Sequence, residues 1–185
     1  SKDLATTALS ALSTTNQPDA PPVLPTIDLA PFLPAHGPDA QIVVHQAYTL
    51  QYSEAHEQAA WVIYRITAEQ LRTSVERTDN FRTDPLVTTG SAVLDDYSGS
   101  GYDRGHLAPA AAMAWSGEIM SESFYLSNMS PQEPGFNRGI WRVLEAEVRD
   151  FAMLHGSVLV VTGPVLRPGL PTIGPSGVSV PERYF

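Results

Sequence analysis

The sequence contains no cysteine, so disulfides, cysteine-ligated zinc, iron–sulfur clusters and thiol nucleophiles are excluded together. It also lacks any apolar run close to the roughly 18 residues that a membrane-spanning helix requires, and we therefore expect no membrane partner. Lysine is almost absent, because Lys2 is the only lysine among 11 basic residues. The net charge of -9 argues against nucleic-acid binding through an overall basic field.

Arginine supplies the other basic residues, and its planar fork suits bidentate contact with phosphate. The arginines in the middle of the chain are Arg72, Arg77, Arg82, Arg104, Arg138, Arg142 and Arg149. The same stretch is also acidic, so this composition predicts local phosphate contacts rather than a basic domain.

The chain of 185 residues has room for one domain of ordinary size. Residues 1–40 are rich in proline and show no periodicity, which predicts an extended or disordered N-terminal segment. Residues 41–185 have the sequence pattern of a folded domain. Because the chain stops two residues into what begins as a strand, we expect this domain to lack its C-terminal part.

Alternation of apolar residues predicts strands over 42–52 and 61–67, joined by a polar turn at 53–58. Further strands are expected over 124–129 and 158–162, the last of them buried on both faces because its apolar run is continuous. Between these two, residues 138–155 are expected to form the one long helix, with Asn137 as its N-cap and Gly156 as its end. Its predicted apolar stripe consists of Ile140, Leu144, Val148 and Phe151.

Reactive residue types are densest between Tyr97 and Pro109, where a glycine-rich stretch leads into Asp103-Arg104-Gly105-His106. In an extended backbone, Arg104 and His106 point to the same side. This spacing would aim a permanent cation and a titratable base at one point. A glycine loop with an incidental histidine is the alternative interpretation.

A second group of polar residues follows the predicted helix, in which Asn137, Glu145 and Arg149 lie four or eight residues apart. An amide oxygen, a carboxylate and an arginine in this order suit a hard cation and a phosphate together. A capping asparagine followed by an ordinary Glu145–Arg149 ion pair is the alternative interpretation.

Taken together, these motifs resemble the DNA/RNA non-specific endonucleases, which carry a ββα-metal (His-Me finger) site. Asp103-Arg-Gly-His106 matches the family signature, and the likeness continues through the segments 125–132 and 135–141. It covers the chain from about Tyr48 to Phe185. Secreted bacterial members are more similar to this chain than endonuclease G is, because a Tyr-Ser-Gly-Ser-Gly-Tyr stretch precedes the signature.

The resemblance implies a role for each matched residue. The general base falls on His106, and the asparagine that ligates a single divalent ion falls on Asn137. The family's phosphate-contacting arginines and other polar site residues fall on Arg104, Glu145, Arg149, Asn128 and Arg77. Arg82 is the alternative to Arg77.

The resemblance also implies an α+β fold, with a central, mostly antiparallel sheet flanked by helices. It implies Mg²⁺ or Mn²⁺ as cofactor and cleavage of DNA and RNA through their phosphate backbone, leaving 5′-phosphate ends. The implied location is secreted or periplasmic rather than mitochondrial, and a homodimer stays open. The alternatives are a catalytically silent module that binds nucleic acid or a protein, and a phosphodiesterase of small nucleotides.

Overall fold

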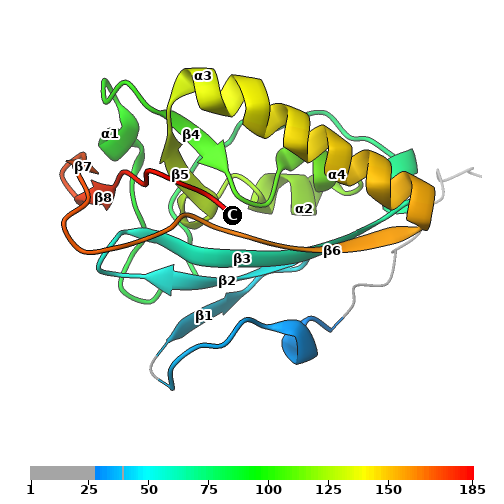
Figure 1. Ribbon diagram of the computed structural model, residues 1–185, viewed down its shortest axis with the longest axis horizontal. Helices are drawn as coiled ribbons and strands as arrows, with labels where there is room; N and C mark the ends of the chain where they lie inside the picture. Colours follow the sequence, from blue (N-terminus) through cyan, green and yellow to red (C-terminus); the bar gives the residue numbers. More distant parts are fainter. Residues whose placement is uncertain (1–27, 39) are drawn as a thin grey trace, which may run out of the picture.

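The computed structural model describes residues 28–38 and 40–185. At its centre lies an antiparallel sheet of four strands in the order β1-β2-β3-β6 (Figure 1). Its strands are β1 (Gln41–Val44), β2 (Tyr48–Ser53), β3 (Gln58–Thr67) and β6 (Ser157–Thr162). The long helix and the short strands β4 and β5 lie on one side of this sheet. The molecule therefore has the α+β architecture that the sequence predicted.

The remaining elements are short except for one helix. The helices are α1 (Leu94–Tyr97), α2 (Gly117–Glu122), α3 (Pro134–Phe136) and α4 (Arg142–His155), with 3-10 turns at Ala30–Phe32, Gln70–Arg72, Ala110–Ala112 and Leu126–Asn128 and a π-helical turn at Asn137–Trp141. The small strands are β4 (Asp103–His106), β5 (Met129–Gln132), β7 (Thr172–Ile173) and β8 (Val178–Ser179). β4 pairs with β5, and β7 with β8.

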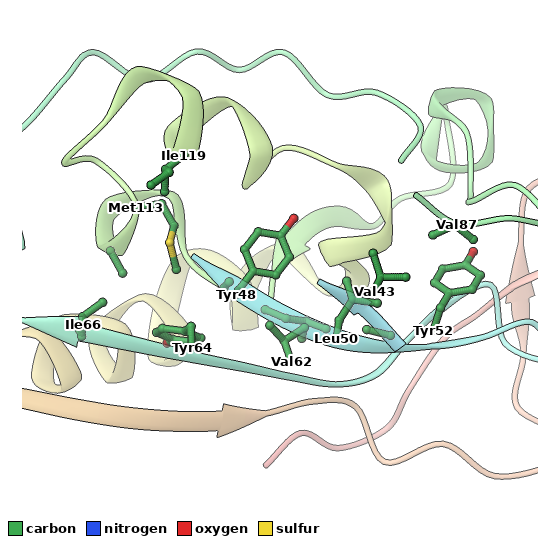
Figure 2. Packing of buried hydrophobic residues seen from close by; sticks show 14 of the residues in the cluster. Val43, Tyr48, Leu50, Tyr52, Val62, Tyr64, Ile66, Val87, Met113 and Ile119 are labelled. Atoms are coloured by element: carbon green, nitrogen blue, oxygen red, sulfur yellow. The ribbon is translucent and has the colours of Figure 1, made fainter. Parts of the chain in front are cut away.

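The core fills the space between the sheet and the layer above it (Figure 2). Leu50 and Val62 of neighbouring strands are fully buried, and Met113 and Ile119 reach them from the loop and helix on the other side. Truncating such a fully buried side chain costs about 2–5 kcal/mol, because lost transfer free energy and a new cavity add together. This core fixes the platform on which the β4–β5 pair and α4 sit.

The strand predicted over 42–52 is wrong as a single element. The chain turns at 45–47 and forms β1 and β2, which pair antiparallel with each other. The amide of His45 donates to the carbonyl of Tyr48 and closes the turn. The side chain of His45 is bonded to Asp84 at 2.9 Å, so a distant residue holds the turn in place. The partner strand over 61–67 is confirmed within β3.

The predicted helix exists, but its start and its buried face differ from expectation. Helical structure begins at Pro134, a favoured first position, so Asn137 is not the N-cap. The π-helical turn that precedes α4 is itself kinked at Gly139, whose backbone angles are not helical. Of the predicted apolar stripe, Ile140, Leu144 and Phe151 are 65%, 49% and 51% exposed, so these three face outward. Only Val148 packs against the core as predicted, and it does so together with Ala152.

The other two predicted strands are confirmed only in part. Residues 126–128 form a 3-10 turn, and the strand β5 follows it at Met129. β6 matches the strand expected over 158–162, but Leu159 and Val161 are 38% and 39% exposed, so it is not buried on both faces. Val158 and Val160 pack against the core, so Leu159 and Val161 lie on the opposite face of the strand, away from the core.

Most of the proline-rich segment 1–40 lies outside the described residues, which begin at Asp28 and omit residue 39. Of the part within them, Ala30–Phe32 forms a 3-10 turn, and the His36 ring lies 6.3 Å from that of Trp61. Across the residues that the structure describes, we find no helix with the length and hydropathy needed to cross a bilayer.

Candidate active site

The β4–β5 hairpin and the helical segment after it form a ββα unit. In the register of this pair, Gly105 lies opposite Ser130, and His106 lies opposite Met129. Alternation along β4 puts Arg104 and His106 on the same face, as the sequence predicted. Gly105 is required by packing, because a Cβ there would lie 2.2 Å from Cδ of Gln132. The glycine of the Asp-Arg-Gly-His sequence therefore allows β4 and β5 to lie this close together.

His106 is held in an apolar and cationic environment. It is 8% exposed, and its ring meets Phe124 edge-on at 4.9 Å between centroids. Its buried Nε2 has no hydrogen-bond partner in the part of the chain that the structure describes. Burial, followed by the guanidinium groups of Arg77 and Arg104, lowers the pKa of His106 to about 3. The imidazole is therefore neutral at pH 7, with an unused nitrogen.

Two arginines line a cleft of about 510 Å³ on this side of the molecule. The guanidinium of Arg104 lies 4.1 Å above the Phe81 ring, and that of Arg77 lies 4.7 Å from the Phe124 ring. Nε of Arg77 donates to Asp79 at 2.7 Å. The two rings thus hold two cations beside His106, where they face the same cleft as Asn137.

Arg82, the alternative to Arg77, makes its contacts with other residues than His106. Its guanidinium lies 4.0 Å from the Tyr125 ring and donates to the carbonyl oxygens of Asn80 and Ser121. It does not belong to the residues that line the cleft. The structure therefore brings Arg77, rather than Arg82, to His106.

Asn137 is joined to β4 through Asp103. Its Nδ2 donates to Asp103 Oδ2 at 2.9 Å, and Arg138 donates to both oxygens of the same carboxylate at 2.8 and 2.6 Å. Hydrogen bonding from Arg138, the largest contribution, keeps the pKa of Asp103 below its usual range. Because the amide nitrogen is used in this way, the amide oxygen of Asn137 is the atom left for a hard cation.

Glu145 and Arg149 occupy successive turns of α4, on the side that faces the sheet. Burial raises the pKa of Glu145 to about 7, against the opposing effect of the Arg149 and Arg77 charges. Nη1 of Arg149 is buried and has no hydrogen-bond partner among residues 28–38 and 40–185. Both side chains influence the buried Tyr64 of β3, whose pKa is raised mainly by its own burial. The four ion pairs of the described residues do not include Glu145 with Arg149, so the alternative interpretation of an ordinary ion pair between them is wrong.

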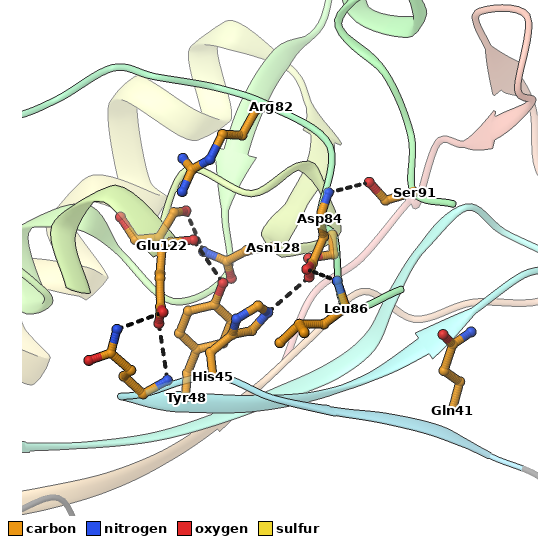
Figure 3. Close-up of polar contacts among 12 residues, drawn as sticks. Gln41, His45, Tyr48, Arg82, Asp84, Leu86, Ser91, Glu122 and Asn128 are labelled. Carbon is orange, nitrogen blue, oxygen red and sulfur yellow. Dashed lines mark hydrogen bonds and ion pairs between the residues drawn. The ribbon is translucent and has the colours of Figure 1, made fainter. Parts of the chain in front are cut away.

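Asn128 lies behind the cleft rather than in its wall. It is fully buried, and its Oδ1 accepts from the amide of Ala108 at 2.8 Å. Its Nδ2 donates to the carbonyl oxygens of Ala108 and Ser123. Figure 3 shows it among polar contacts that also include His45, Asp84 and Glu122. Its amide is committed to the backbone, so its position suits a residue that fixes the loop after His106.

Sequence reasoning missed the contact made by Trp141. The indole Nε1 of Trp141 donates to the backbone carbonyl of His106 at 3.2 Å, and this bond ties the helix to the end of β4. Phe81 and Phe124 were missed as well, although they seat the arginines and the imidazole. An aromatic residue beside an arginine-rich motif was the only available signal, and it is a weak one.

The donor set fits a divalent ion that keeps most of its water. Across the described ranges, no cluster of three or more His, Cys, Asp or Glu side chains could enclose a metal. The single oriented amide oxygen of Asn137 matches the preference of Mg²⁺ for oxygen ligands and retained water.

The chain was compared with known proteins, and residues 34–185 match the model of the DNA/RNA non-specific endonuclease family. Human mitochondrial endonuclease G is 37% identical over 158 residues, which cover 79% of this chain and 53% of that protein. Nuclease C1 of Cunninghamella echinulata is 39% identical over 157 residues, covering 76% of this chain and 61% of that protein. A nuclease of a Nostoc species is 33% identical over 198 residues, covering 98% and 71%.

Among solved structures, a chain of the EndoG/EndoGI complex, described as showing the mechanism of EndoG inhibition, superimposes with a TM-score of 0.72. It is 34% identical, and the match covers 78% of this chain and 65% of that one. The chain spans about half the length of the mitochondrial endonuclease G that it matches. The matched range includes the whole ββα unit and its cleft, and the chain belongs to the DNA/RNA non-specific endonuclease family.

Proposed function

We propose that this protein is a metal-dependent endonuclease that hydrolyses phosphodiester bonds of DNA and RNA with little sequence preference and leaves 5′-phosphate ends. The observation that carries the proposal is the neutral, unpartnered Nε2 of His106 between two arginines. A neutral base beside fixed cations is what attack of water on a phosphodiester requires.

His106 acts as the general base in this proposal. Its neutral imidazole takes a proton from the water that attacks phosphorus in line with the departing 3′ oxygen. The carbonyl contact from Trp141 and the packing against Phe124 hold the ring so that Nε2 keeps its position. A fixed acceptor loses less orientational entropy on the way to the transition state.

Arg77, Arg104 and Arg149 offset charge on the phosphate during attack. The first two are seated on aromatic rings and therefore need little reorganisation when substrate binds. All three address the backbone of a nucleic acid rather than its base edges, which is the reason for the expected low sequence preference.

Asn137 and Glu145 would hold a Mg²⁺ or Mn²⁺ ion, the first through its amide oxygen and the second through the ion's water. When bound, the ion would neutralise charge that develops on the phosphate and on the leaving oxygen. Asp103 orients the Asn137 amide for this purpose. Asn128 serves as a positioning residue, because it fixes the backbone at Ala108, two residues beyond His106.

Location and oligomeric state rest only on the family likeness. Relatives are found in mitochondria, in fungi and in a cyanobacterium. We propose a secreted or periplasmic enzyme, which cell fractionation would test. A homodimer would be recognised by sedimentation of the purified protein.

The central experiment incubates the purified chain with plasmid DNA and with RNA, with Mg²⁺ or with a chelator. We expect both polymers to be cut only with the metal, and His106→Ala to lose at least ~10²-fold in rate while its circular dichroism is unchanged. Tight binding without cutting would indicate the silent module. Faster turnover of a dinucleotide than of long DNA would indicate a phosphodiesterase of small nucleotides.

A further inference from the structure

The side chain of Gln132 is buried in an unusual way. The residue is 1% exposed, and neither Nε2 nor Oε1 has a hydrogen-bond partner among the residues that the structure describes. Buried amide groups are nearly always paired, because an unpaired one loses its hydration without compensation. A buried donor and acceptor left open on the same side chain therefore require an explanation.

The chain makes room for this amide. Gln132 ends β5 opposite Asp103, and its side chain passes over Gly105, where any Cβ would lie 2.2 Å from Cδ and Oε1. The glycine between Arg104 and His106 thus places the amide directly behind the candidate active site. An apolar side chain of the same length would fit the same space without the cost of desolvation.

Gln132 also lies in the wall of a pocket of about 530 Å³. Three aromatic residues of this wall pack together: Phe136 and Trp141 each lie 5.4 Å from the Tyr184 ring. The hydroxyl of Tyr184 is bonded to Ser130 and to the carbonyl of Pro131, which fixes its ring. The pocket therefore combines a rigid aromatic wall with an unpaired amide.

This pocket adjoins the arginine-lined cleft. Tyr102 lines both of them, and Asp103, the next residue, binds Asn137 inside the cleft. The two cavities therefore meet at Tyr102, two residues before Arg104.

We propose that this pocket is a nucleobase subsite of the same enzyme, with Gln132 as the residue that reads the base; the proposal rests on the proposed nuclease function. A nucleobase carries a donor and an acceptor side by side on one edge, the pattern that a glutamine amide pairs with in a bidentate manner. It also has a π-face that stacks on aromatic side chains. The subsite gives the enzyme a preference for the base beside the cleaved bond.

The test compares binding of adenosine 5′-monophosphate with that of ribose 5-phosphate to the full chain, by equilibrium dialysis in the presence of a chelator. Both ligands offer the same phosphate, so their ratio isolates the base. We expect the nucleotide to bind roughly tenfold more tightly, and Gln132→Met to remove most of this advantage. Gln46→Met, in the turn between β1 and β2, is the matched control and should retain it.

Gln132→Met removes two unpaired polar groups and keeps the length of the side chain. We therefore expect its melting temperature to equal or exceed that of the wild type, which separates loss of binding from loss of folding. Equal binding of the two ligands, or full discrimination by Gln132→Met, would overturn the subsite. The subsite would also be overturned if an apolar dye bound in the pocket and the nucleotide did not displace it. The pocket would then suit an apolar polypeptide segment rather than a base.

The two proposals fail in different ways. Dialysis needs neither metal nor turnover, so a base preference can be found in a protein that cuts nothing. Conversely, plasmid cleavage with equal binding of the two ligands would leave the nuclease function standing and remove the subsite. Sequencing the ends produced from a random DNA library then shows whether Gln132→Met flattens the distribution of bases at the cut.

Discussion

At the scale of single residues, His106 owes its protonation state to what surrounds it. Burial among apolar rings disfavours the imidazolium, and Arg77 and Arg104 oppose it further. The same features that keep the imidazole neutral at pH 7 make its protonation unfavourable in the folded state. Acidification should therefore lower the free energy of unfolding. This decrease can be measured without substrate.

Protonation of His106 should destabilise the fold below pH 6.5. Its folded pKa, about 3, is lower than the unfolded value of 6.5, so the unfolded state binds more protons between these pH values. Stability then falls as the pH decreases through this window, by about 3 kcal/mol between pH 6.5 and 4. Urea unfolding of metal-free protein should show this loss, and His106→Gln should lack it. An equal loss in both proteins would contradict the assignment.

Glu145 should show the opposite dependence. Burial raises its folded pKa to about 7 from 4.5, so the folded state binds more protons between these values. The stability that the protonated carboxyl contributes is complete below pH 4.5 and is lost as the pH rises through 7. Glu145→Gln, a neutral isostere, should remove this decline in the chelator-treated protein. Urea unfolding at pH 5 and pH 8 measures the difference, and parallel curves for the two proteins would argue against a buried carboxyl.

At the scale of elements, Asp103 links β4 to the start of the helical segment. Its carboxylate accepts from Asn137 and from Arg138, so both elements depend on one side chain. Asp103→Ala should free the Asn137 amide and weaken Mn²⁺ binding by roughly 10–100-fold, as expected for loss of a residue that orients a ligand. Isothermal titration would measure it. Arg138→Ala keeps the Asn137 contact and should lose only a few-fold; equal losses would point to the ion pair instead.

Asn128 connects the loop after β4 with the end of α2. Replacement by alanine would remove three hydrogen bonds and leave buried backbone groups of Ala108 and Ser123 unpaired. We expect Asn128→Ala to lose about 3 kcal/mol of stability in urea unfolding, together with activity. Asn80→Ala, which removes two exposed hydrogen bonds, one from Thr78 and one to Ser121, is the control and should lose less than about 1 kcal/mol. Similar losses for the two variants would contradict the role given to Asn128.

The pairing of β2 with β3 and the placement of Arg104 and His106 followed from local pattern, because alternation in a strand is set by the residues themselves. The turn at 45–47 did not, since His45 is held there by Asp84, 39 positions away. The outward face of α4 was also misjudged. An apolar stripe predicts a buried face only where another layer covers it, and of the predicted stripe only Val148 is packed against the core, together with Ala152.

The candidate site shows the same division. Motif spacing singled out Asn137 and Glu145 as candidates, and the structure places both on one helical segment. The choice between Arg77 and Arg82 depended on which of them meets Phe124 rather than Tyr125, a tertiary contact that no local pattern encodes. No sequence pattern pointed to Gln132, because the feature that distinguishes it is a buried amide without hydrogen-bond partners in the described part of the chain.

At the scale of the whole molecule, net charge opposes binding of a polyanion. The chain carries a charge of -9, so long-range attraction to nucleic acid is not available. In the proposed function, binding would then depend on a few arginines around His106 and on a metal ion. Such binding is sensitive to salt, but much less so than that of a basic protein with many phosphate contacts.

The salt dependence of DNA binding therefore measures how many arginines contact phosphate groups. Three phosphate contacts, from Arg77, Arg104 and Arg149, predict a slope of log K against log salt of about -3 for double-stranded DNA. Fluorescence anisotropy of metal-free protein would measure it without cleavage. Arg77→Ala should reduce the slope by about 1. Arg167, which is paired with Glu182 outside the cleft, serves as control, and Arg167→Ala should leave the slope unchanged. A slope much steeper than -3, unaffected by Arg77→Ala, would place the phosphate contacts on another surface.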